Sequence, residues 1–172
     1  AGFEWLTIDM EHSAINLDVA QNLIATIKAN KMDALVRVGK NDELIIKQVM
    51  DAGADGVIVP MICSKEDAEH AVGSVKYPPI GKRGVGLARA QKYGIGFDQY
   101  KDWLNTSSVV IAQIEHKDAV ENIEDIINVD GADYLIGTTG GTISNSVDGY
   151  GLGIVVASSP TDSEFLNFGL QG

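Results

Sequence analysis

His, Arg, Gln and carboxylate side chains stand at the ends of several apolar, strand-like segments of this sequence. The first segment ends in Asp9-Met10-Glu11-His12, the second carries Arg37, and a later one ends in Gln113-Ile114-Glu115-His116. Histidine changes charge near neutral pH, arginine binds anions and carboxylates bind hard divalent cations. Residues of these types, gathered at strand ends, indicate a catalytic site.

His12 and Arg37 each have a functional and a structural interpretation. His12 is a candidate base or ligand, and Asp9, three residues earlier, could hold its tautomer; the alternative is a capping histidine. Arg37 lies in the apolar run Ala34–Val38, where a buried guanidinium must find an anion. That anion is either a substrate or a structural partner such as Glu11.

Two further strand ends offer groups that could bind a ligand. Gln113 and Glu115 point to the same side by strand alternation, and Glu115 with a second carboxylate could hold a divalent cation. The run Gly137–Thr142 could hold a phosphate or carboxylate through its backbone N–H groups. It matches neither phosphate-binding glycine pattern, so a plain turn is the alternative.

The elements that must position these residues alternate between strand and helix. Apolar strands and amphipathic helices follow one another about six times, which predicts a parallel sheet covered by helices. Both a (β/α) barrel and a doubly wound open sheet fit this pattern, and both place their sites at the carboxyl ends of the strands. The predicted strands are 3–9, 34–38, 56–60, 108–114, 132–136 and 153–157, and the predicted helices are 16–30, 42–52, 64–75, 97–104, 117–128 and 160–168.

Composition narrows the class of protein. The chain of 172 residues has the size of one globular domain, and its net charge of −11 argues against nucleic acid as a partner. Its longest apolar runs are too short for a membrane span, so no membrane partner is expected. The single cysteine, Cys63, cannot pair within the chain, which favours a reducing compartment and hence the cytoplasm.

Five ordered motifs resemble the HpcH/HpaI aldolase family, class II pyruvate-dependent aldolases of 2-keto-3-deoxy acids. The resemblance covers about residues 2 to 137. The motifs are Gly2-Phe3-Glu4-Trp5-Leu6 through Asp9-Met10-Glu11-His12-Ser13, Leu35-Val36-Arg37-Val38, Ala52-Gly53-Ala54-Asp55-Gly56-Val57-Ile58-Val59-Pro60-Met61, Tyr77-Pro78-Pro79-Ile80-Gly81-Lys82-Arg83-Gly84 with Arg89-Ala90, and Ala112-Gln113-Ile114-Glu115.

The resemblance implies a function and a role for each motif residue. It implies a metal-dependent aldolase, a carbon–carbon lyase that reversibly cleaves a 2-keto-4-hydroxy acid to pyruvate and an aldehyde through an enolate. By that resemblance, His12 with Asp9 forms the catalytic base region and Arg37 binds the keto oxygen and stabilises the enolate. Gln113 lies beside the substrate, backbone amides around Gly137, Thr138 and Thr139 hold the pyruvate carboxylate, and Glu115 binds the metal.

The implied cofactor is a divalent cation, Mg²⁺, Mn²⁺ or Co²⁺, and the implied assembly is a homo-oligomer. The family's next motif reads roughly Gly-Pro-x-Asp-Leu-Ser, and its Asp is the second metal ligand. This chain has Gly137-Thr138-Thr139-Gly140-Gly141-Thr142 there, without the second carboxylate, and Asp148 is the nearest one downstream.

The fold implied is a (β/α)₈ TIM barrel. A complete barrel takes about 250 residues, so we expect residues 1–172 to form a single barrel domain that lacks the first strand, a late helix and the last strand. The alternative is a non-catalytic or phosphate- or flavin-binding, flavodoxin-like α/β module that uses the Gly137–Thr142 loop. A flavin colour would favour that alternative.

Overall fold

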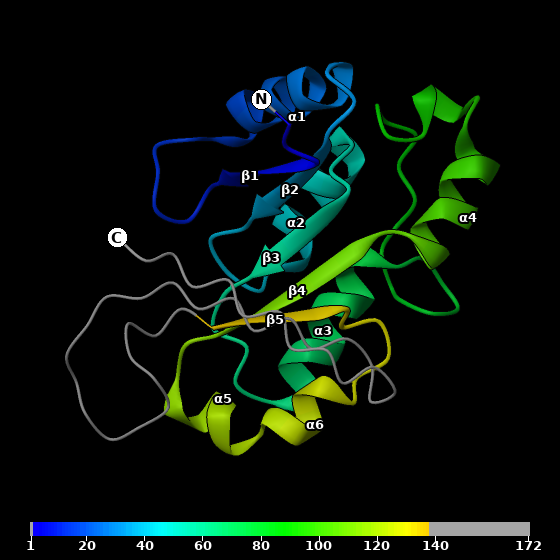
Figure 1. Ribbon diagram of the computed structural model, residues 1–172. Coiled ribbons are helices and arrows are strands. Elements are labelled where there is room, and N and C mark those ends of the chain that lie inside the picture. The colour runs from blue at the N-terminus through cyan, green and yellow to red at the C-terminus, as the bar shows by residue number, and fades with distance from the viewer. Residues whose placement is uncertain (1, 138–172) are drawn as a thin grey trace.

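The protein is described by a computed structural model over residues 2–137, and these residues form a parallel β-sheet with helices (Figure 1). The five strands are parallel and lie in the order β1-β2-β3-β4-β5. They are β1 (Trp5–Asp9), β2 (Asp33–Arg37), β3 (Gly56–Val59), β4 (Val109–Ile114) and β5 (Tyr134–Gly137). The strand and helix expected at 153–157 and 160–168 lie outside the described residues.

The helices connect successive strands. They are α1 (Leu17–Ala29), α2 (Glu43–Ala52), α3 (Lys65–Val75), the 3-10 turn η1 (Lys92–Gly94), α4 (Phe97–Thr106), α5 (Lys117–Glu121) and α6 (Ile123–Ile127). No helix in residues 2–137 combines the length and the apolar character needed to cross a lipid bilayer.

One face of the sheet packs against the helices and the other faces away from them. In β2, Ala34 and Val36 are fully buried and belong to the core that includes Ile24 of α1 and Ile46 of α2. The alternate residues of β2, Leu35 and Arg37, point to the opposite face, because successive side chains of a strand point to opposite sides.

This arrangement is that of a (β/α) barrel. A flavodoxin-like sheet has the order 2-1-3-4-5 and carries helices on both faces, because its connections reverse direction at a switch point. Here the order is sequential without a reversal, and one face of the strands forms the common core with the helices. The open-sheet alternative is therefore wrong, and the described strands curve around part of a barrel.

Local sequence sets the ends of the first three connecting helices. The side chains of Asn16, Asp42 and Ser64 each accept a hydrogen bond from a backbone N–H of the first turn that follows. These N-caps satisfy amides that have no partner within the helix. After α2, Gly53 adopts a left-handed conformation with φ 104°, which ends the helix without the steric cost that a side chain would bring.

The predicted helix over residues 117–128 is wrong in one respect. The structure has two short helices, α5 and α6, divided at Asn122. The side-chain amide of Asn122 donates to the carbonyl oxygen of Cys63 at 2.9 Å. We attribute the break to this contact, which ties the segment to the loop after β3.

The long segment between α3 and α4 is anchored by a buried arginine. Arg83 has no exposed surface, and its guanidinium donates to the hydroxyls of Tyr77 and Tyr100 at 2.9 and 2.8 Å. The backbone N–H of Ala90 donates to the carbonyl oxygen of Asp51 in the last turn of α2. Since α2 leads into the amino end of β3, this segment lies at the sheet edge opposite the carboxyl ends of the strands (Figure 1).

Candidate active site

The sheet register brings the predicted site residues to one edge. Asp9 at the end of β1 lies opposite Arg37 at the end of β2, and Ile114 at the end of β4 lies opposite Gly137 at the end of β5. Gln113 comes one residue before the end of β4. In a parallel sheet these carboxyl ends share one edge, which is where barrel enzymes place their sites.

Arg37 is paired with two carboxylates. Its Nε donates to Oδ1 of Asp9 at 3.0 Å and its Nη2 donates to Oδ2 of the same carboxylate, so the contact is bidentate. Nη1 lies 3.4 Å from Oε2 of Glu11. The hydrogen bonds from Arg37 lower the pKa of Asp9 from 3.8 to about 2, and the same pair raises the pKa of Arg37. The anions that this guanidinium requires are therefore two carboxylates. Asp9 is the hydrogen-bonded partner, and Glu11 is the more distant one.

His12 lies beside this pair but is not oriented by Asp9. The carboxylate of Asp9 accepts from the backbone N–H groups of Glu11 and His12 at 2.9 and 3.1 Å, and it forms no hydrogen bond with the imidazole within the described chain. The ring Nε2 of His12 is 3.6 Å from Oε2 of Glu11, and the side chain is 70% exposed. Asp9 thus fixes the backbone that carries His12, and the role of His12 as a base stays a prediction.

Gln113 and Glu115 form the second half of the site. Gln113 is almost completely buried, and its Nε2 donates to Oε2 of Glu115 at 2.8 Å. Oε1 of Glu115 accepts from the backbone N–H of Met61 at 2.8 Å. The expectation that Gln113 and Glu115 share a side of the strand is confirmed. The negative charge of Glu115 also contributes to the raised pKa of Arg37, which places the two halves within electrostatic reach.

Oxygen donors at this edge have the chemistry that a hard divalent cation requires. Glu115 is held in one orientation by Gln113 and Met61, and Oε2 of Glu11 is buried without a hydrogen bond. Residues 2–137 contain no group of three or more His, Cys, Asp or Glu side chains arranged to hold a metal ion. The donor type of Glu115 fits such an ion, and we keep it as the predicted ligand.

Part of the predicted site lies outside the described residues. Gly137 ends β5, next to Ile114 across the sheet. Thr138 and Thr139, the rest of the run to Thr142, and Asp148 are not among the residues that the structure describes. Their predicted roles stay predictions.

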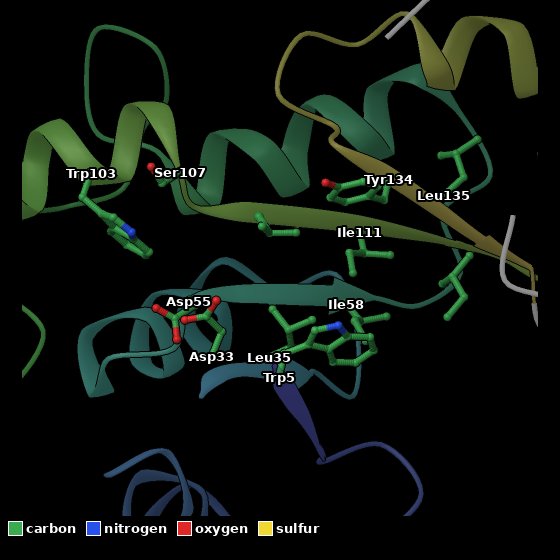
Figure 2. A pocket seen from close by; sticks show the side chains of 12 residues that line it. Trp5, Asp33, Leu35, Asp55, Ile58, Trp103, Ser107, Ile111, Tyr134 and Leu135 are labelled. Atoms are coloured by element: carbon green, nitrogen blue, oxygen red, sulfur yellow. The ribbon is translucent and has the colours of Figure 1, made fainter. Parts of the chain in front are cut away.

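A cavity of about 380 Å³ lies on the face of the sheet to which Leu35 and Arg37 point, but toward the amino ends of the strands (Figure 2). Its walls include Leu35, Ile58 and Ile111, the strand residues that point away from the helices, with Trp103 of α4 beside them. None of the predicted site residues lines it. It is the apolar inner face of the sheet, separate from the polar edge.

Sequence reasoning missed one group of the site, the backbone N–H of Met61. This residue follows the end of β3, and its amide holds the carboxylate of Glu115. The rule that sites collect at carboxyl ends of strands indicated the position, but residue type did not, because methionine carries no reactive group.

The strands are parallel and lie in sequential order, and the carboxyl edge of the sheet carries an arginine–carboxylate pair and a Gln–Glu pair. These features are those of a (β/α)-barrel enzyme. Residues 1–138 match the family model described as HpcH/HpaI aldolase/citrate lyase. The chain belongs to this family.

Curated relatives and solved structures extend this finding. The chain is 43% identical over 135 residues to a 4-hydroxy-2-oxovalerate aldolase of Novosphingobium aromaticivorans, covering 78% of this chain and 51% of that protein. It is 38% identical to a 4-hydroxy-2-oxo-heptane-1,7-dioate aldolase of Salmonella dublin, covering 77% and 51%. A crystal structure of a family member from Burkholderia cenocepacia J2315 matches with a TM-score of 0.74 and 33% identity, covering 79% of this chain and 55% of that one. The chain therefore spans about half the length of the curated relatives that it matches.

Proposed function

We propose that this chain is part of an aldolase that reversibly cleaves a 2-keto-4-hydroxy acid to pyruvate and an aldehyde. The observation that carries the proposal is Arg37, whose guanidinium is held at the carboxyl edge of the sheet by a bidentate contact with Asp9. The aldolases among the relatives support the same reaction class.

Arg37 supplies the electrostatics that the reaction needs. Breaking the C3–C4 bond of the substrate leaves its electron pair as an enolate, with negative charge on the former keto oxygen. A guanidinium that is already oriented stabilises this charge without reorganising when the bond breaks. Arg37 has five N–H donors, and two of them donate to Asp9. The remaining donors can hydrogen-bond to the enolate oxygen.

The remaining residues bind the substrate and move protons. A base must take the proton of the C4 hydroxyl, and His12 is the proposed base because its ring is exposed at this edge. Gln113 is proposed to lie beside the substrate, and amides around Gly137, Thr138 and Thr139 to hold the pyruvate carboxylate. Glu115 would hold a divalent cation, Mg²⁺, Mn²⁺ or Co²⁺, which when bound adds Lewis-acid stabilisation of the enolate oxygen.

The test is aldol formation from pyruvate and a panel of aldehydes, with Mg²⁺ or Mn²⁺ and with EDTA. We expect carbon–carbon bond formation that stops on complete chelation and returns when metal is restored. Activity that survives chelation, together with borohydride trapping of a lysine, would instead indicate a Schiff-base aldolase.

We also propose the wider setting of this activity. Residues 1–172 belong to one barrel domain, and the protein acts in the cytoplasm as a homo-oligomer on small-molecule substrates. The single cysteine, Cys63, supports the reducing compartment. The exposed apolar side chains of the segment before α4 support self-association.

A further inference from the structure

Met61 has a backbone conformation that its residue type does not explain. Its φ is 54°, in the left-handed region that favours glycine, and it follows β3 at the carboxyl edge of the sheet. Three other non-glycine residues of the described chain, Lys31, Lys92 and Tyr93, have positive φ. Lys31 precedes β2, and the other two lie before α4, so Met61 is the one of the four next to the candidate site.

The turn after β3 is held by three successive amides. The N–H of Met61 donates to Oε1 of Glu115 at 2.8 Å, that of Ile62 to the carbonyl oxygen of Gln113 at 3.3 Å, and that of Cys63 to Oδ2 of Asp67 at 3.1 Å. With Met61 in this left-handed conformation, the first two amides both contact residues at the end of β4. Strained conformations persist where surrounding contacts determine them in this way, and they gather at functional sites.

The backbone contacts do not require a methionine. Glycine would provide the same N–H groups and the same φ without steric cost. The side chain of Met61 nevertheless stays 53% exposed, so the core does not hold it there either. An apolar, unbranched side chain is kept in a strained conformation, open to solvent, on a residue whose amide binds Glu115.

We propose that Met61 is a specificity-determining residue whose side chain contacts the carbon chain of the aldehyde half of the substrate. The inference rests on the proposed function. Arg37 and the Gln113–Glu115 pair serve the pyruvate half, so the exposed apolar group beside Glu115 is available to the second reactant. Methionine is flexible and polarisable, which suits unbranched aliphatic aldehydes of different lengths.

Met61→Gly tests the inference because it keeps the turn and removes only the side chain. We expect the free energy of unfolding to hold or rise, while kcat/KM for an unbranched aldehyde such as pentanal falls about 10-fold relative to kcat/KM for glycolaldehyde, the scale of a lost apolar contact. Met61→Leu should restore most of the preference for pentanal. Lys31→Gly is the matched control, a positive-φ residue away from the site, and should leave the ratio of the two kcat/KM values unchanged.

A second measurement separates this inference from the proposed function. Exchange of the pyruvate methyl protons with D₂O, followed by NMR, reports on the pyruvate half alone. In Met61→Gly, kcat/KM for pentanal should fall by a larger factor than the rate of proton exchange. An unchanged pentanal-to-glycolaldehyde ratio in an enzyme that still exchanges protons would overturn the role of Met61. A wild-type protein that exchanges none would overturn the proposed function and this inference with it.

Discussion

At the carboxyl edge of the sheet, the guanidinium of Arg37 is bound to the carboxylate of Asp9. This contact determines how Arg37 can act on a substrate. Asp9 occupies Nε and one proton of Nη2, while Nη1 faces Glu11 at 3.4 Å. The guanidinium is therefore fixed in its plane, with donors left over for a substrate oxygen. Such a group is oriented before the substrate arrives.

Arg37→Lys should remove this orientation while keeping the charge. Lysine has a single ammonium on a flexible stem and cannot form the bidentate contact with Asp9. We expect kcat/KM for aldol cleavage to fall about 100-fold or more. The circular dichroism spectrum and melting temperature should stay near those of the wild type. A variant that keeps kcat/KM within about threefold would remove Arg37 from the proposed mechanism.

Asp9→Asn should change the acid dependence of stability. The pKa of Asp9 is lowered from 3.8 to about 2 by its hydrogen bonds, so its contribution is present above pH 3.8 and is lost as the pH falls through about 2. Because the carboxylate is one-third exposed and screened by solvent, we expect the variant to lose about 1 kcal/mol at pH 7. Urea unfolding at pH 7 and near pH 2 measures this. The difference between the two proteins should shrink at the lower pH, and a constant difference would contradict the assignment.

Much of this edge could be predicted from residue types, including the contact of Arg37 with Glu11, but the main partner of Arg37 could not. Strand-end positions identified Asp9, Arg37, Gln113 and Glu115 as neighbours at one edge. Spacing along the chain suggested Asp9 with His12, whereas the register places Asp9 directly across from Arg37, 28 residues away. A guanidinium attracts a carboxylate more strongly than a largely exposed imidazole does.

At the scale of elements, the close approach of β3 to β4 brings the turn after β3 beside Gln113 and Glu115. Gly56 begins β3 opposite Val109, and a Cβ at residue 56 would lie 2.5 Å from the carbonyl oxygen of Val109. The strand after Gly56 leads to Met61, and the strand after Val109 leads to Gln113 and Glu115.

Gly56→Ala should therefore disturb the sheet and the site together. Overpacking against backbone atoms costs about 1–3 kcal/mol, because the strands must separate. We expect that loss in urea unfolding and a lower kcat/KM, since Glu115 and the turn after β3 move apart. Gly84→Ala, where nothing lies within 4 Å of the new Cβ, is the control. Equal stability of the two variants would contradict the close approach.

Periodicity predicted the elements because helices and strands are decided locally, and it failed where a distant contact intervened. The helix starts predicted at residues 42 and 64 agree with the structure, because Asp42 and Ser64 are N-caps whose side chains bond their own helix. The break between α5 and α6 depends on Asn122 meeting Cys63, 59 residues earlier in the chain. The burial of Arg83 against Tyr77 and Tyr100 likewise depends on tertiary contacts that periodicity does not register.

At the scale of the whole molecule, charge is distributed unevenly. Residues 76–96 carry five of the chain's 13 basic residues and none of its 24 acidic ones. The same segment exposes five large apolar side chains: Ile80, and the four that we name the loop patch, Val85, Leu87, Tyr93 and Ile95. Ile95 is 95% exposed, although the segment before it is anchored to α2 by the backbone hydrogen bond from Ala90 to Asp51. Lys76 and Arg83 are buried, so the accessible cations of this segment are Lys82, Arg89 and Lys92. Because the chain as a whole is acidic, we expect a second copy to offer a surface complementary to this apolar and basic segment.

Replacing Leu87 and Ile95 by serine should weaken self-association. Each buried aliphatic side chain contributes about 2 kcal/mol to association, so the double variant should raise the dissociation constant about 1,000-fold. Light scattering over a dilution series should show the wild-type oligomer persisting where the variant has dissociated. Val19→Ser is the matched control, because Val19 is an exposed apolar residue of α1 outside the loop patch. Since the loop patch lies at the sheet edge opposite Arg37, the dissociated variant should still exchange the methyl protons of pyruvate. If it keeps the wild-type dissociation constant instead, the copies meet through another surface.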